Sequence, residues 1–467
     1  MSVLDRLRRL LFGPARDIKA PDAMHKLSLV ALLAWVGLGA DGLSSSAYGP
    51  DEAFRALGDH TGLAFFLAIA IAATVFIISH GYNRIIEQFP SGGGGYVVAS
   101  HLLHRQVGLV SGAALLVDYV LTITISIASG ADAIFSFLPQ SLHAWKLPTA
   151  FFGLALLTIL NFRGVKESVT ALLPIFMAFL ILHALLLAVA IGGHLGDVGA
   201  LSHEVRRNVA STAGALGTFG ALKLFVHAYC MGGGTYTGIE AVSNGVGMMR
   251  EPRVQTAKRT MLLMATSLAI TAAGLVLAYL LVRVHPEPGK TLNAVLLERV
   301  MGGWSLGGFR VGSLLVIGSL VSEGALLFVA AQAGFAGGPR VMANMAVDSW
   351  LPRRFAALSD QLSLRNGVAL MAAAACAAMI YTRGSVSKLV VMYSINVFLT
   401  FSLSNLAMGR FWIRHRKNPS WLRNLWAHML ALALCLTILV VTTIEKFTEG
   451  GWVTLLVTAA LVFVCFS

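Results

Sequence analysis

Long apolar runs, separated by short polar segments, dominate the pattern of this chain. Gly62–Ser79 and Met261–Val282 contain no charged residue over 18 and 22 positions. Helices of that length can cross the hydrocarbon core of a bilayer, which is roughly 30 Å thick. The pattern predicts an all-α polytopic membrane protein. We expect twelve spans near 27–57 (interrupted), 62–80, 107–137, 147–161, 168–192, 217–248 (interrupted), 260–283, 308–336, 367–382, 389–409, 425–443 and 451–467.

Two of the predicted spans, the first and the sixth, contain glycine-rich polar runs. The runs read GLGADGLSSSAYG (37–49) and CMGGGTYTGIEAVSNG (230–245). An unwound backbone in hydrocarbon costs several kcal/mol for each unsatisfied group unless it lines a cavity or binds something. The runs therefore predict helix breaks at a functional site. We place these breaks at Gly39, Gly42, Gly232, Gly233 and Gly234.

The spacing of the two interrupted spans predicts internal symmetry. They lie five spans apart, and because five is odd they enter the membrane from opposite sides. Such pairing is typical of transporters built from inverted repeats. We therefore expect an N-terminal arm, two repeats and two further spans. The last span stops at Ser467, so we expect that a soluble tail is missing from this sequence. The predicted ranges are 1–26 (arm), 27–192 (spans 1–5), 193–409 (spans 6–10) and 410–467 (spans 11–12).

Composition and charge narrow the class further. Only 12% of residues are charged, against about 25% in soluble domains. Of the 35 lysines and arginines, 23 fall in the N-terminal arm and the even-numbered loops. This asymmetry predicts that both termini are cytoplasmic. It also explains the net charge of +13 through anionic inner-leaflet lipid, without nucleic acid.

Enzyme and cofactor chemistry find no support in the motifs. The four cysteines form no CxxC pair, so neither a disulfide nor a cysteine metal site is indicated. The glycine run in Phe89–Ser100 lacks the Lys-Ser/Thr ending of a phosphate-binding loop. We therefore expect no enzymatic activity and no cofactor.

Oxygen-bearing side chains gather at the breaks and on two other spans. Asp118, Thr122 and Ser126 are four residues apart and so share one helix face. Hard cations prefer carboxylate, hydroxyl and carbonyl oxygens, and a carboxylate inside a membrane indicates function by default. No basic residue belongs to this predicted site. The remaining candidates are Asp41 and Tyr48 at the first break, Thr237 and Glu240 at the second, and Tyr393 in span 10.

Structural roles remain open for several of these polar residues. Serines such as Ser44 and Ser45 commonly make interhelical hydrogen bonds. Asp41 and Asp118 could belong to structural ion pairs, although no cationic residue lies near them in sequence. Glu240 could simply brace span 6. For the isolated His183 and Glu323 we expect buried, hydrogen-bonded structural roles.

Several segments carry a family resemblance that spans nearly the whole chain. TGIEAVSNGV (237–246), REP (250–252) and FPSGGGGYVVAS (89–100) resemble permeases of the amino acid–polyamine–organocation (APC) superfamily. This resemblance implies a LeuT-type fold of 5+5 inverted repeats plus two spans. LSSSAYGPDE (43–52) and VDYVLTITISIASG (117–130) are similar to the KimA-type bacterial potassium importers.

The narrower resemblance implies a bacterial inner-membrane symporter of potassium and protons. Such importers work as homodimers and carry a cytoplasmic C-terminal domain, absent from these residues, that is thought to respond to a cyclic dinucleotide. By position, potassium would bind most directly at Asp41, Asp118, Thr122 and Thr237, and Glu240 would be the proton-linked carboxylate. The wider set of implied ion contacts is Asp41, Tyr48, Asp118, Tyr119, Thr122, Ser126, Thr237 and Tyr393.

Two transport hypotheses follow. The first is potassium import coupled to protons by alternating access, with K⁺ and H⁺ as the transported species. The second is a proton-coupled amino acid permease. An amino acid needs free backbone amides for its carboxylate at the break of span 1, where Asp41 would repel it. A third class, a sensor or scaffold without transport, gives no reason for two broken spans.

Overall fold

A computed structural model describes residues 29–92, 94–163, 168–194, 196, 198–305, 307–359 and 364–466. Within this part, apart from one isolated bridge between Leu29 and Met249, the regular structure is helical. The predicted N-terminal arm lies outside the described residues. The α-helices are α3 (Ala31–Ser44), α4 (Gly49–Arg55), α5 (Ala64–Gln88), α6 (Gly95–Leu102), α7 (Arg105–Phe135), α8 (Lys146–Arg163), α9 (Ser168–Gly192), α10 (Val198–Met231), α11 (Glu240–Asn244), α12 (Arg253–Leu281), α13 (Leu292–Met301), α14 (Val311–Val347), α15 (Arg365–Thr382), α16 (Val386–Arg414), α17 (Trp421–Glu445) and α18 (Trp452–Phe466).

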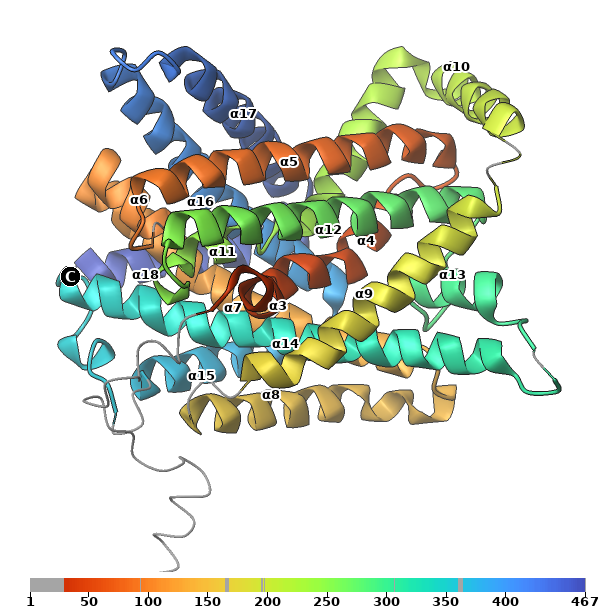
Figure 1. Cartoon of the computed structure of the whole chain (residues 1–467), viewed down its shortest axis with the longest axis horizontal. Coiled ribbons are helices and arrows are strands. Elements are labelled where there is room, and N and C mark those ends of the chain that lie inside the picture. The colour runs from red at the N-terminus through yellow and green to blue at the C-terminus, as the bar shows by residue number, and fades with distance from the viewer. Residues whose placement is uncertain are drawn as a thin grey trace, which may run out of the picture.

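The long helices form one bundle whose common direction is the expected membrane normal. Ten stretches of the described helices are long and apolar enough to cross a membrane. The other two predicted spans are also helical: the broken pair α3–α4 and the 18-residue α15. In Figure 1, α5, α12 and α14 run across the view, with α6 towards one end and α13 towards the other. We refer to these as the α6 end and the α13 end.

Small residues allow the central helices to approach closely. A Cβ added to Gly334 of α14 would lie 2.6 Å from the carbonyl oxygen of Tyr119 on α7. A Cβ on Gly130 of α7 would lie 3.1 Å from the carbonyl oxygen of Gly324 on α14. Lipid tails are as apolar as leucine, so membrane helices associate mainly through such close packing. This packing makes α7 the most buried of the candidate spans.

The break in span 1 lies later in the chain than the sequence predicted. Gly39 and Gly42 are inside the continuous helix α3, so the predicted breaks at these two glycines are wrong. The chain leaves the α-helix in a 3-10 turn at Ser45–Ala47, and Tyr48 (φ −125°, ψ −32°) precedes α4. Backbone hydrogen bonds continue through Gly39 and Gly42 because glycine disfavours a helix by only about 1 kcal/mol.

The break in span 6 begins where the sequence predicted. Helix α10 ends at Met231, and Gly232, Gly233 and Gly234 form a 3-10 turn that extends to Tyr236. The chain then becomes extended at Thr237 and takes a positive φ of 81° at Gly238 before α11.

The two breaks cross with backbone against backbone. A Cβ on Gly238 would lie 2.6 Å from the amide nitrogen of Gly42 and 2.8 Å from the carbonyl carbon of Asp41. One turn further along, the hydroxyl of Ser45 donates to the carbonyl oxygen of Thr235 at 2.9 Å. The glycines of span 1 thus permit contact between the interrupted spans.

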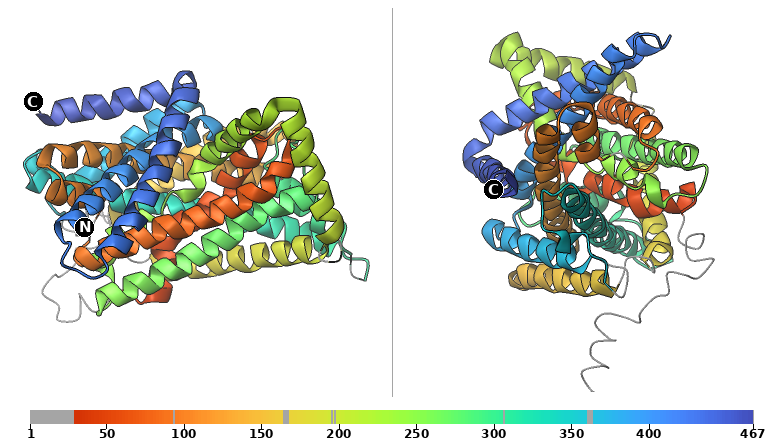
Figure 2. Two further views of the ribbon diagram at one scale, coloured as in Figure 1. Left: turned by 90° about the horizontal axis from the view of Figure 1, so that it is seen from above. Right: turned by 90° about the vertical axis from the view of Figure 1, so that its left-hand side faces the viewer.

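Three helical segments at the bundle ends were not expected. The short helices α6 and α13 lie in predicted loops, and α10 begins near residue 198 rather than 217. A kink at Gly217 (φ 73°, ψ 161°) separates the added part of α10 from the predicted span. Figure 2 shows α18 along one edge of the bundle, where it packs on α7 and α16.

Replacing Gly238 with alanine should strongly destabilise the fold. The added methyl would clash with α3, and a positive φ costs a non-glycine residue about 1–2 kcal/mol in addition. We expect G238A to lower the melting temperature of the purified protein by several degrees and to reduce its folded yield. Gly318, with nothing within 4 Å of its added Cβ, provides the control G318A, which should melt like the parent. Equal melting of G238A and G318A would contradict the crossing.

Candidate functional site

The predicted site residues come together where the two breaks meet α7 and α16. Each is at most 4% exposed, although they come from four separate spans of the chain. The set includes the eight predicted ion contacts and the predicted proton-linked residue. Their exposures are Asp41 3%, Tyr48 4%, Asp118 1%, Tyr119 2%, Thr122 2%, Ser126 1%, Thr237 1%, Glu240 2% and Tyr393 0%.

Three buried carboxyl groups form the centre of this site. Asp41 on α3, Asp118 on α7 and Glu240 on α11, here called the acidic trio, interact electrostatically with one another. Both oxygens of Asp118 and Oε2 of Glu240 lack a hydrogen-bond partner. No ion pair found among the described residues includes a member of the trio. Because like charges repel strongly in a low dielectric, the trio requires a bound cation or protons.

Hydroxyl groups surround the trio. The Tyr48 side chain is within hydrogen-bonding reach of Thr237 and interacts electrostatically with all three carboxyl groups. Tyr393 also interacts with all three, and its hydroxyl has no hydrogen-bond partner. Thr122 donates to the carbonyl oxygen of Asp118 at 3.0 Å, and Thr237 to that of Gly234 at 2.6 Å. Both threonine oxygens keep lone pairs with which to accept a further contact.

The carboxyl groups of the trio do not converge tightly enough for a compact metal site. Among the described residues, no three His, Cys, Asp or Glu side chains are grouped as metal ligands. A cation held here would therefore take most of its ligands from hydroxyl and backbone carbonyl oxygens. Such ligands suit a large, weakly polarising cation better than a transition metal.

The consecutive serines of the first break are structural. Ser44 and Ser46 donate to the carbonyl oxygens of Asp41 and Leu43 at 2.8 and 2.7 Å. Ser45 donates to the carbonyl oxygens of Gly42 and Thr235. Apart from that of Thr235, these carbonyl groups lie in the last turn of α3, where the membrane offers no water to bond them.

Asn244 is a site-adjacent residue that sequence reasoning missed. Its Nδ2 donates to the hydroxyl of Tyr119 at 2.5 Å. A Cβ on Gly94 would lie 2.6 Å from Asn244 Oδ1, so the glycine-rich loop before α6 closes around this side chain. The position of Asn244 within TGIEAVSNGV was the available signal, but nothing in the sequence indicated contact with α7.

A vestibule connects the site to the α13 end. This cavity of about 560 Å³ includes Tyr48 and Ser129 in its lining and extends to Lys290 and Ser387. Three ion pairs lie in or beside its lining: Arg55 with Asp51, Lys146 with Asp132 at 2.6 Å, and Lys290 with Glu298 at 2.5 Å. The hydrogen bond to Glu298 raises the pKa of Lys290.

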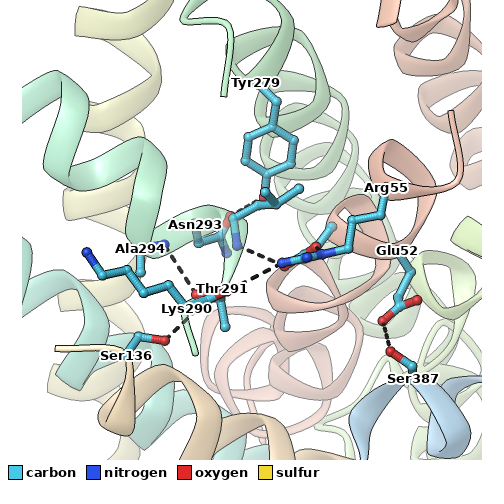
Figure 3. Close-up of polar contacts among 11 residues, drawn as sticks. Glu52, Arg55, Ser136, Tyr279, Lys290, Thr291, Asn293, Ala294 and Ser387 are labelled. Carbon is cyan, nitrogen blue, oxygen red and sulfur yellow. Dashed lines mark hydrogen bonds and ion pairs between the residues drawn. The ribbon is translucent and has the colours of Figure 1, made fainter. Parts of the chain in front are cut away.

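Figure 3 shows how the wall of the vestibule is fastened. Ser387 at the start of α16 donates to Glu52 of α4 at 2.7 Å. On the other side, Arg55 donates to the carbonyl oxygen of Lys290, and the amide of Leu292 donates to Asp51 at 2.9 Å. Helix α4 thus contacts both α16 and the start of α13.

Comparison with known proteins identifies the family of this chain. The model of the amino acid permease family matches residues 28–466. The chain belongs to this family of the APC superfamily. It is also 31% identical over 445 residues to "Potassium transporter KimA" of Bacillus subtilis, a match that covers 94% of this chain and 70% of the relative.

Membership in this family establishes the fold and the general class of the protein. It has the LeuT-type fold expected from the sequence, with spans 1 and 6 interrupted. The family and the relative are transporters rather than enzymes, and the ten apolar helices make the chain a multi-pass membrane protein. The predicted boundaries between its two repeats stay a prediction.

At the α6 end of this permease, hydrogen bonds tie α6 and the start of α7 to the end of α14. The Tyr96 hydroxyl donates to the Asp348 carboxylate, and Arg105 donates to the Asp348 carbonyl oxygen. Burial, together with the bond to Asp348, raises the pKa of Tyr96. The guanidinium of Arg105 also stacks over Trp350, 4.9 Å from the ring centroid. The helix α6, which follows the glycine-rich loop around Asn244, is therefore tied to the end of α14.

Removing one charge from the trio should stabilise the protein when no small cation is present. In alkaline buffer that contains only a bulky organic cation, we expect D118N to melt several degrees above the parent, because the amide does not repel Asp41 and Glu240. The matched control is D132N on the same helix, which loses its ion pair with Lys146 and should melt at or below the parent. A melting temperature of D118N at or below that of the parent would contradict the trio.

Proposed function

We propose that this permease imports potassium, in symport with protons, by alternating access around the acidic trio. The observation that carries the proposal is a set of three mutually interacting carboxyl groups, each at most 3% exposed and none in an ion pair found among the described residues. A buried charge without a partner is strongly destabilising. A transported cation would supply the missing charge while it is bound.

Potassium fits the ligands better than an amino acid does. Hydroxyl, carboxylate and carbonyl oxygens are the donors that hard cations take, and the similar Bacillus subtilis protein is named as a potassium transporter. The α-carboxylate of an amino acid would meet Asp41, one turn before the first break, with no cationic ion-pair partner found there among the described residues. We assign the principal potassium contacts to Asp41, Asp118, Thr122 and Thr237.

Proton coupling follows from the charge left behind when potassium leaves. Glu240 accepts from backbone N–H groups, including that of Gly238, while its Oε2 remains unpaired. A proton on Glu240, or shared across the trio, would then reduce the repulsion that the cation had relieved. Because interacting carboxyl groups titrate as a unit, we assign the coupling proton to the trio, with Glu240 as its principal site.

The proposed orientation has both termini in the cytoplasm. The α13 end and its vestibule then face outwards, and the inside-negative membrane potential adds about 2.3 kcal/mol per charge for each 100 mV. A homodimer in the bacterial inner membrane, and regulation by a cyclic dinucleotide through a C-terminal domain, remain predictions from the resemblance.

Transport by the purified protein tests the substrate directly. Proteoliposomes should accumulate rubidium or potassium, and an inward proton gradient should raise the initial rate several-fold. A panel of amino acids offered to the same vesicles should not accumulate. Uptake of an amino acid without potassium would overturn the proposal. Potassium uptake at the same rate with and without the proton gradient would rule out symport with protons.

Growth of a potassium-uptake-deficient bacterium tests the trio. The parent should rescue growth at low potassium, and D118N should fail to do so because the bound cation loses a carboxylate. Thr124 lies on the same helix but donates to the carbonyl oxygen of Val120, so T124V is the matched control and should rescue. Rescue by D118N at parental level, with equal membrane expression, would show that the site is elsewhere.

A further inference from the structure

A second buried acid–base contact lies outside the acidic trio. His183 on α9 and Glu323 on α14 are each 1% exposed, with Nε2 and Oε2 3.4 Å apart. The sequence suggested only separate structural roles for these residues. Asn293 of α13 donates to the same Oε2 at 3.1 Å, and the Tyr279 hydroxyl on α12 donates to Asn293 Oδ1. The contact therefore joins four helices.

The hydrogen bonds determine where a proton must be. His183 Nδ1 lies 3.0 Å from the carbonyl oxygen of Phe179, which can only accept, so Nδ1 carries a hydrogen. In a neutral imidazole, Nε2 then presents a lone pair to Glu323. A carboxylate would face that lone pair with its Oε1 unpartnered, in a region without solvent. One proton, on either Nε2 or Oε2, removes this repulsion and makes the pair neutral overall.

We propose that His183 and Glu323 form a second proton-binding site, whose proton holds α13 against the α13 end of the bundle. The ligand is a single proton taken from water. When it is bound, Asn293 links α13 to a neutral pair. When it leaves, a buried charge of −1 remains, and exposing that charge to water requires α13 to separate from α9 and α14.

Helix α13 connects this contact to the vestibule. On one side its first residues are fastened to the vestibule through Asp51 and Arg55 of α4. On the other side its contact with the His183–Glu323 pair runs through Asn293, which Figure 3 shows beside Tyr279. The helix thus bridges the half-helix of span 1 that follows the break and the pair on spans 5 and 8. A proton at the pair can therefore bias the vestibule wall without touching the acidic trio.

Other titratable groups surround the His183–Glu323 pair. Of these groups, the Tyr279 hydroxyl interacts electrostatically with Glu323. The phenyl ring of Phe179, which does not titrate, stacks on His183 with centroids 3.8 Å apart. The other titratable groups in this half of the bundle include three ion pairs, two members of the trio, and Arg299 of α13, which donates to the carbonyl oxygen of Arg283. The ion pairs are Asp51 with Arg55, Glu298 with Lys290 and Asp132 with Lys146, and the members of the trio, towards the middle, are Asp41 and Asp118.

Hydrogen exchange of α13 tests the proposal on the full chain in lipid. After correction for intrinsic rates, the parent's α13 amides should exchange about tenfold faster at about pH 8.5 than at about pH 5.5. E323Q replaces the carboxyl group with an amide that is neutral at both pH values. The α13 amides of E323Q should therefore exchange at the same corrected rate at both pH values, whereas H183Q, which keeps the Glu323 carboxyl, should shift the pH at which exchange accelerates. A merely structural role would change protection equally at both pH values.

His194 provides the matched control for the histidine. It contacts the carbonyl oxygen of Ala190 through Nδ1 at 2.7 Å, as His183 contacts Phe179, but no ion pair found among the described residues includes it. H194Q should keep the parental pH dependence. Parental pH dependence in both H183Q and E323Q, or no dependence in the parent, would overturn the proposal.

Infrared spectroscopy provides a second test that involves no potassium. On acidification, the difference spectrum of the parent should contain a protonated-carboxyl band, or a histidinium band, that E323Q lacks and D118N retains. Identical spectra for the parent and E323Q would contradict the second proton site. Failure of potassium uptake would leave both results unaffected, because neither measurement depends on the transported ion.

Discussion

The structure depends on bringing two broken helices into contact inside a membrane. Hydrocarbon cannot hydrogen-bond to the free amides and carbonyls of a helix end, so each break must be satisfied by protein. Here the breaks satisfy each other in part: Gly238 lies against the backbone of Gly42, and Ser45 bonds across to Thr235. That crossing places carboxyl groups of α3 and α11 near Asp118 of α7. The close approach and the buried charge are thus consequences of one constraint.

The buried charged groups of the molecule fall into three regions, which differ in the partners that these groups have. At the vestibule, Arg55, Lys146 and Lys290 form ion pairs with acids. The acidic trio has no such partner in a described ion pair, so its state depends on what binds. The His183–Glu323 pair is intermediate, because one proton makes it neutral. The proposed symport of potassium and protons uses a site of the second kind, supported by a framework of the first.

Much of the site was predictable because polar atoms in apolar runs are rare. Asp41, Asp118 and Glu240 stood out against uncharged neighbours, and Thr122 and Ser126 followed from helical spacing. The break in span 1 was misplaced because glycine was taken as the cause of unwinding. In the structure Gly39 and Gly42 stay helical and serve close packing, while the turn occurs among serines that bond their own backbone. Asn244 and the pairing of His183 with Glu323 were missed because each depends on contacts between distant segments.

The sequence by itself determined the helical membrane class, ten of the twelve spans by length and hydropathy, and the oxygen-rich chemistry of the site. Those properties are local: they depend on run length, on helical periodicity and on the cost of placing a carboxylate in hydrocarbon. Tertiary structure alone decided which carboxyl groups meet, which serines are structural, where α13 rests and which histidine faces which acid. Such pairings depend on the crossing of helices far apart in the chain, and no pattern within one helix specifies its neighbour.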